Sequence, residues 1–133
     1  MRVKKVAIIG AGTIGRGWIP LFARAGMEVR VFDPCTENRH AALAASELTL
    51  RDLASYGLVA DAQAAFRLVR PVDSLHAALD GVDYAQESAP EDVVTKQAVN
   101  RRANGTPYRR AKGTPFSRWR KVDRTRALAL RAA

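Results

Sequence analysis

The sequence contains a complete G-x-G-x-x-G motif at residues 10–15, directly after a short apolar run. That run, from Val3 to Ile9, is rich in β-branched residues, which is typical of a buried strand in a parallel sheet. After the motif, apolar side chains recur at helical spacing as far as Gly26, a residue type that commonly ends helices. A strand, a glycine turn and a helix in this order predict the start of a βαβ unit.

A second strand, from Met27 to Asp33, completes this unit, because its apolar residues alternate and it ends in an acid. Asp33 follows Gly10 by 23 residues, the spacing at which a carboxylate is expected to bind the adenosine ribose of a dinucleotide. Its charge would repel a 2′-phosphate, and neither Pro34 nor Cys35 supplies an arginine beside it. The pattern therefore predicts NAD, rather than NADP, as the cofactor.

The three glycines of the motif have different physical tasks. Gly10 permits a tight turn, Gly12 lets the backbone approach the pyrophosphate, and Gly15 lets the helix pack closely on the strand. Free amides and the helix dipole then attract the anion, each such contact contributing about 0.3–1 kcal/mol. A glycine turn without a ligand is the alternative, which the matched context disfavours. The cofactor-binding residues predicted here are Gly10, Ala11, Gly12, Thr13, Ile14, Gly15 and Asp33.

Helices and strands alternate along the rest of the first hundred residues. Helices are expected at 36–56 and 74–79, strands at 66–69 and 82–88, and a further helix opens at Pro90. Thr36 is the predicted cap of the first of these helices. This alternation predicts an α/β fold, a Rossmann-type doubly wound parallel sheet of about four strands in the order 3-2-1-4.

One residue of the first helix is at odds with the pattern. Pro20 lies beyond the first turn, so it removes a backbone hydrogen bond to residue 16 and is expected to kink the helix. The alternative is a domain that is less stable than its relatives, because proline costs about 3 kcal/mol in a helix interior.

The positive charge of the chain is confined to its last part. Residues 1–97 hold 11 Lys and Arg against 12 Asp and Glu, whereas residues 98–133 hold 11 against Asp123 alone. The latter segment shows no period of 2 or 3.6, and only 126–133 could form a short helix. We therefore divide the chain into a domain at 1–99 and an irregular basic tail at 100–133. In the order 3-2-1-4, the fourth strand would then lack a neighbour and leave an open edge.

Three interpretations of the tail compete. Its Arg-, Ala-, Gly- and Pro-rich composition favours an out-of-frame end of a GC-rich coding sequence. A nucleic-acid-binding arm, with Tyr108, Phe116 and Trp119 among its arginines, is the rival interpretation, although nucleic acid is not the expected partner. A plain disordered extension is the third.

Cysteine content and hydropathy indicate the compartment. The single cysteine, Cys35, excludes a disulfide framework and fits a reducing environment. No apolar run approaches the roughly 18–20 residues needed to cross a bilayer, and no cleavable signal precedes the first strand. We expect a cytoplasmic protein without a membrane partner.

Three segments carry a family resemblance: V-A-I-I-G-A-G-T-I-G-R-G-W at 6–18, V-F-D at 31–33 and Q-E-S-A-P-E-D-V-V-T-K at 86–96. They resemble the NAD-binding domain of the 3-hydroxyacyl-CoA dehydrogenase family, most closely its lambda-crystallin/L-gulonate 3-dehydrogenase branch. The resemblance covers about residues 3–99, the first third of a typical member. It implies NAD-dependent oxidation of a 3-hydroxy group to a ketone. It also implies that Glu91 and Lys96 lie near the nicotinamide ribose, and that Glu87 ends a strand beside the cofactor.

The chain departs from this family in its catalytic half. The family's histidine in an H-P-x-N-P context, its supporting glutamate and its serine-rich segment have no counterpart in residues 1–133. His40 and His76 fall in predicted helices and are expected to face solvent. By the same resemblance, the helical domain that contacts an acyl-CoA or sugar-acid substrate and forms the family's dimer has no counterpart in residues 1–133. We assign no catalytic residue and no metal site, and we expect weak NAD binding at best and no turnover.

Two further assignments stay open at this point. Another NAD-dependent dehydrogenase could share the first βαβ unit, because a fold alone does not determine chemistry. A nucleotide-binding module with a basic nucleic-acid arm is the alternative outside the enzymes.

Overall fold

The computed structural model describes residues 2–88, 108–110 and 118–121 of the 133-residue chain. Its sheet has the strand order β3-β2-β1-β4-β6-β5. The four parallel strands are β1 (Lys5–Ile9), β2 (Glu28–Phe32), β3 (Val69–Pro71) and β4 (Tyr84–Glu87). Strand β6 (Arg118–Lys121) pairs antiparallel with β4 and with β5 (Tyr108–Arg110). The predicted α/β fold and the parallel order 3-2-1-4 are confirmed.

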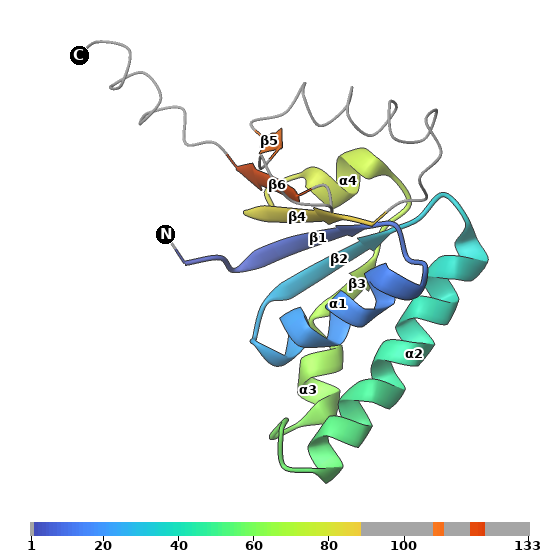
Figure 1. The fold of residues 1–133 in the computed structure, drawn as a ribbon, viewed down its shortest axis with the longest axis vertical. Coiled ribbons are helices and arrows are strands. Elements are labelled where there is room, and N and C mark those ends of the chain that lie inside the picture. The colour runs from blue at the N-terminus through green and yellow to red at the C-terminus, as the bar shows by residue number, and fades with distance from the viewer. Residues whose placement is uncertain (1, 89–107, 111–117, 122–133) are drawn as a thin grey trace.

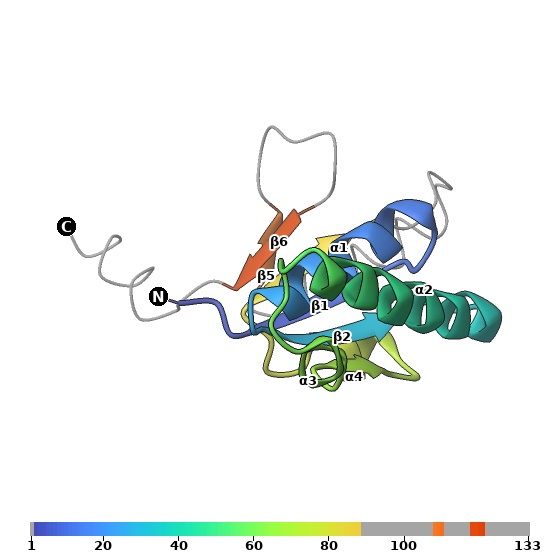
Figure 2. The same cartoon turned by 90° about the horizontal axis from the view of Figure 1, so that it is seen from below.

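Four helices connect the parallel strands. They are α1 (Thr13–Arg24), α2 (Thr36–Ser55), α3 (Ala62–Phe66) and α4 (Leu75–Leu79). Helices α1 and α2 lie on one face of the sheet and α4 lies on the other, as Figures 1 and 2 show from two directions. No helix in the part of the chain that the structure describes is long and apolar enough to cross a membrane.

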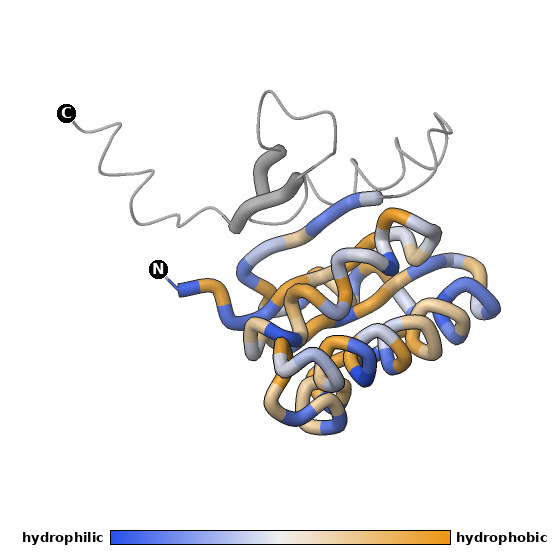
Figure 3. Tube along the Cα trace, turned by 60° about the horizontal axis from the view of Figure 1, so that its bottom comes forward, coloured by the Kyte–Doolittle hydropathy of each residue, from blue (hydrophilic) through white to orange (hydrophobic). Residues whose placement is uncertain are grey.

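The core consists of two apolar layers separated by the sheet. In β1, Val6 and Ile8 pack with residues of α1 and α2, whereas Ala7 and Ile9 pack with residues of α4. All four are at most 1% exposed, which explains why this strand is a continuous apolar run without alternation. Figure 3 shows the same pattern, with hydrophobic strands at the centre and helices of alternating character around them.

The third strand begins three residues later than predicted. Phe66, expected to start it, instead ends α3, a helix that the sequence analysis did not predict. Asp61 caps this helix by accepting hydrogen bonds from the amides of Gln63 and Ala64, both at 3.0 Å. The strand itself ends in Pro71, which is tolerated because β3 is at the edge of the sheet.

The starts of two helices also differ from expectation in detail. The N-cap of α2 is Cys35, not Thr36, and no side chain caps it; the Thr36 hydroxyl instead accepts a hydrogen bond from Arg39. The short fourth helix begins at Leu75, one residue later than expected. Ser74 is its N-cap, and the Ser74 hydroxyl accepts a hydrogen bond from the amide of Ala77. Helix α1 continues through a buried Pro20 to Arg24 without a break.

The prediction that β4 has an open edge is wrong, because β6 pairs with it. Ala85 lies opposite Trp119 in the antiparallel ladder between these strands. Two short strands therefore interrupt the segment predicted to be irregular. Sequence periodicity missed them because each is only three or four residues long and rich in arginine. The helices expected at Pro90 and at 126–133 lie outside the described residues.

Candidate functional site

The glycine turn between β1 and α1 has the conformation and the packing that its residue types require. Gly10 has φ +96°, a value that residues other than glycine rarely adopt, and its N–H donates to Phe32 O at 2.9 Å. A Cβ on Gly15 would lie 1.8 Å from Gly10 O, so the helix crosses the strand at a distance that only glycine permits. A Cβ on Gly12 would meet nothing within 4 Å, which leaves open space beside that backbone.

The first turn of α1 presents unused donors to this space. The N-cap is Gly12, and the helix has neither a side-chain cap nor an acid in its first turn. The first amides of any helix have no acceptor within the helix, and here they belong to Thr13 and Ile14, both exposed. Together with the positive end of the helix dipole, these amides form an environment that favours an anion.

Asp33 lies against the turn, immediately after β2. It is 5% exposed, and its carboxylate accepts the amide of Ala11 on Oδ2 and the amide of Cys35 on Oδ1, both at 2.8 Å. Asn38 approaches Oδ1 at 3.4 Å. These donors stabilise the buried charge. Because Oδ1 accepts from both Cys35 and Asn38, Oδ2 is the carboxylate oxygen that keeps a further lone pair for a ligand hydroxyl. Asp33 therefore connects two loops, a structural contact that the sequence analysis did not predict.

Arg16 also contacts the turn, and the sequence analysis did not single it out. Its Nε donates to the carbonyl of Ala11 at 3.0 Å, so the side chain extends back beyond the first residue of its own helix. The signal available in the sequence was a basic residue in the first helical turn, because helical side chains point toward the N-terminus.

The carboxyl ends of β1 and β4 lie side by side at one edge of the sheet. Glu87 is 4% exposed at the end of β4 and lies opposite Ile9, the last residue of β1. The amide of Ser88 donates to Ile9 O at 2.7 Å. Among the described residues, Ser88 Oγ is the buried side-chain polar atom without a hydrogen-bond partner. The chain reverses its strand order between these two strands, and ligands of open α/β sheets bind at such a point.

The remaining candidate residues are distributed as follows. Glu91 and Lys96 lie outside the described residues. His40 on α2 and His76 on α4 are exposed, as predicted. Within the described ranges, no group of His, Cys, Asp and Glu side chains could hold a metal ion.

Cys35 and Glu37 form a contact at the start of α2, next to Asp33. The thiol of Cys35 donates to Glu37 Oε2 at 3.0 Å. This bond, together with a backbone hydrogen bond, holds the pKa of the Glu37 carboxyl below its ordinary value.

Comparison with known proteins identifies the family. Residues 5–109 match the model of the 3-hydroxyacyl-CoA dehydrogenase, NAD binding domain. This chain belongs to that family. The resemblance found in the sequence is thereby confirmed, and the chain is a member of a family of NAD-dependent dehydrogenases.

Its relatives in the family are considerably longer proteins. The L-carnitine dehydrogenase of Oceanobacillus iheyensis is 36% identical over 97 residues, which cover 73% of this chain and 31% of the relative. The lambda-crystallin homolog of Bos taurus is 34% identical over 97 residues, with 69% and 30% covered. The 3-hydroxybutyryl-CoA dehydrogenase of Escherichia coli K12 superposes with a TM-score of 0.67 at 28% identity, with 74% and 21% covered. The chain thus spans about a third or less of each.

Proposed function

We propose that this chain binds NAD(H) at the turn between β1 and α1, as the nucleotide-binding part of a dehydrogenase that acts on a 3-hydroxy group. The observation that carries the proposal is the combination of a glycine-dependent turn, exposed helix amides and a buried carboxylate at one point of a family-typical sheet. When bound, NAD would accept or supply the hydride, and the described residues would hold it.

Each part of the cofactor has a candidate partner in the chain. The amides at Thr13 and Ile14 would bind the pyrophosphate, with Gly12 leaving the space for it. Asp33 would accept hydrogen bonds from the hydroxyls of the adenosine ribose, and its negative charge would exclude a 2′-phosphate. These residues belong to the predicted cofactor-binding set, which is Gly10, Ala11, Gly12, Thr13, Ile14, Gly15 and Asp33. The family resemblance adds Glu91 and Lys96, which it implies lie near the nicotinamide ribose.

The 3-hydroxy substrate class is supported by the relatives. L-Carnitine and 3-hydroxybutyryl-CoA, the compounds in two of their names, share a hydroxyl on the carbon β to a carboxyl or thioester carbon. Residues 1–133 contain two histidines, and both are exposed on helices rather than at the carboxyl ends of the strands. We therefore propose that this segment alone binds the cofactor weakly and does not catalyse substrate oxidation. NADH formation by the purified chain from L-carnitine, L-gulonate or a 3-hydroxyacyl-CoA would overturn this part.

The division of the chain at 1–99 and 100–133 stays a prediction. The family match extends to residue 109, and the pairing of β6 with β4 joins part of the second segment to the first.

Titration with NADH and NADPH tests the binding proposal. We expect the wild type to prefer NADH, and we expect Asp33→Asn to weaken NADH binding by about tenfold or more, since a hydrogen bond to a charged group contributes about 1.5–3 kcal/mol. Asp52→Asn, the same change at an exposed position on α2, is the matched control and should bind as the wild type does. A folded wild type that binds NADH no better than Asp33→Asn does contradicts the proposal.

A further inference from the structure

Ala11, the second residue of the glycine motif, is held from two sides by charged groups. Its N–H donates to Asp33 Oδ2 at 2.8 Å, and its carbonyl accepts from Arg16 Nε at 3.0 Å. Both polar groups of this residue are therefore occupied by side chains, and the turn is held in its conformation before any ligand arrives. Ala11 itself has no amide left to offer to an anion.

The guanidinium of Arg16 uses one of its five donors in this contact. The group is planar and permanently charged, so the position of Nε determines where the η nitrogens lie. Within the described part of the chain, these η nitrogens have no acceptor and Arg16 forms no ion pair. A positive charge with unused donors thus lies at the turn, on the carbonyl that directly precedes Gly12.

We propose that Arg16 is a phosphate-binding residue of the same site, with Nε on the Ala11 carbonyl and the η nitrogens donating to a pyrophosphate oxygen of NAD(H). The inference rests on the proposed function and adds a charged partner to a site otherwise made of neutral amides. Charge-assisted hydrogen bonds are roughly twice as strong as neutral ones. NADH affinity should therefore depend on residue 16 and on ionic strength.

The test compares variants of the full chain in titrations with NADH and with adenosine, which lacks phosphate. Arg16→Gln should weaken NADH binding by about ten- to a hundredfold, because it removes a hydrogen bond to a charged group. Adenosine binding, which depends on Asp33, should change less than about twofold. Arg16→Lys keeps the charge but lacks the planar guanidinium with its several donors, so its NADH affinity should be intermediate. Arg24→Gln, an identical change in the exposed last turn of α1, is the matched control and should bind as the wild type does.

Salt dependence separates a phosphate contact from a purely structural role. Wild-type affinity for NADH should fall between low and high ionic strength, and Arg16→Gln should lose most of that dependence. Equal weakening of NADH and adenosine would mean that Arg16 only holds Ala11, and would overturn the inference. Unchanged NADH binding in Arg16→Gln would also overturn it, whereas a folded wild type that binds neither compound removes the proposed function itself. If Arg16→Gln does not fold, the Arg16→Lys comparison and the wild-type salt dependence decide.

Discussion

At the scale of single residues, the glycine turn is the most constrained part of the molecule. Gly15→Ala would place a methyl group 1.8 Å from Gly10 O, a backbone atom that cannot move aside without displacing β1 or α1. We expect a loss of about 1–3 kcal/mol or more in the free energy of unfolding, measured by urea denaturation. Gly17→Ala is the control on the same helix. Because nothing lies within 4 Å of its Cβ, it should stabilise the protein by about 0.5–1 kcal/mol.

A second prediction at this scale follows from the contact between Cys35 and Glu37. Because the thiol donates to the carboxylate, Cys35→Ala should raise the pKa of Glu37 toward its ordinary value, which NMR titration of the carboxyl carbon can measure. In the wild type the folded-state pKa is depressed, so any stabilisation from this pair is present above the unfolded-state pKa. It is lost as the pH falls through the folded-state pKa. An identical Glu37 titration in both proteins would contradict the contact.

At the scale of elements, the short helix α4 depends on a side chain from the strand beneath it. Arg30 of β2 donates from one η nitrogen to the carbonyls of Ala77 and Asp80 at the end of this helix. These carbonyls have no partner within the helix, and a cation there also complements the dipole. The salt bridge of Arg30 with Glu28 is partly exposed to solvent, and we expect it to add about 0–1 kcal/mol.

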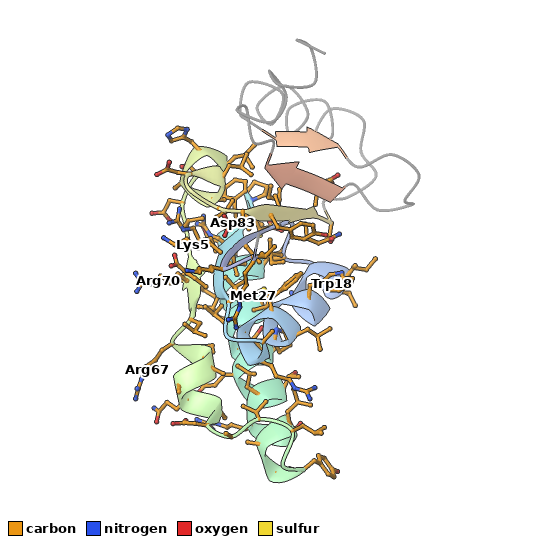
Figure 4. The ribbon with its side chains drawn as sticks, turned by 90° about the vertical axis from the view of Figure 1, so that its left-hand side faces the viewer. Lys5, Trp18, Met27, Arg67, Arg70 and Asp83 are labelled. Atoms are coloured by element: carbon orange, nitrogen blue, oxygen red, sulfur yellow. The ribbon has the colours of Figure 1, made fainter. Side chains whose placement is uncertain are left out.

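Arg30→Met should therefore destabilise the protein by about 1–2 kcal/mol, as measured by thermal or urea unfolding. The matched control is Arg70→Met on the neighbouring strand β3, whose exposed side chain extends away from the molecule in Figure 4. It should change stability by less than about 0.5 kcal/mol. Equal effects of the two substitutions would show that the contacts of Arg30 with α4 contribute nothing.

The elements also show which features a sequence can predict. The structural tasks of Gly10 and Gly15 were predictable because a left-handed turn and a close helix crossing each require glycine. The ribose-binding role of Asp33 stays a prediction. Phe66 was assigned to the wrong element because a short apolar run fits a helix or a strand equally well. The contact of Arg16 with Ala11 was missed because the path of a long side chain depends on the turn that it reaches. The roles assigned to Glu91 and Lys96 stay predictions.

At the scale of the whole molecule, the sheet continues past β4 through a hairpin of basic strands. Periodicity could not predict this, because the pairing of such short segments is decided by the free edge that they meet rather than by their own pattern. Strand β5 in turn forms the new edge, and the arginines in its sequence disfavour pairing with another chain.

Trp119→Pro tests this arrangement, since proline cannot donate to a ladder and is poorly tolerated inside a sheet. We expect faster hydrogen exchange at the amides of β4 and increased aggregation, measured by NMR or mass spectrometry and by light scattering. Arg109→Pro, in the outer strand β5, should leave the exchange of β4 amides nearly unchanged. Unaltered β4 protection in Trp119→Pro would indicate that β6 does not cover this edge.

The double attachment of Asp33 has a consequence for attempts to redesign cofactor preference. Libraries that randomise position 33 to accept NADP would also release the amides of Ala11 and Cys35, so many variants would fail in folding before their selectivity could be scored. A successful redesign has to supply a substitute acceptor for those amides, for example the carbonyl of an asparagine, and place the new arginine elsewhere along the start of α2.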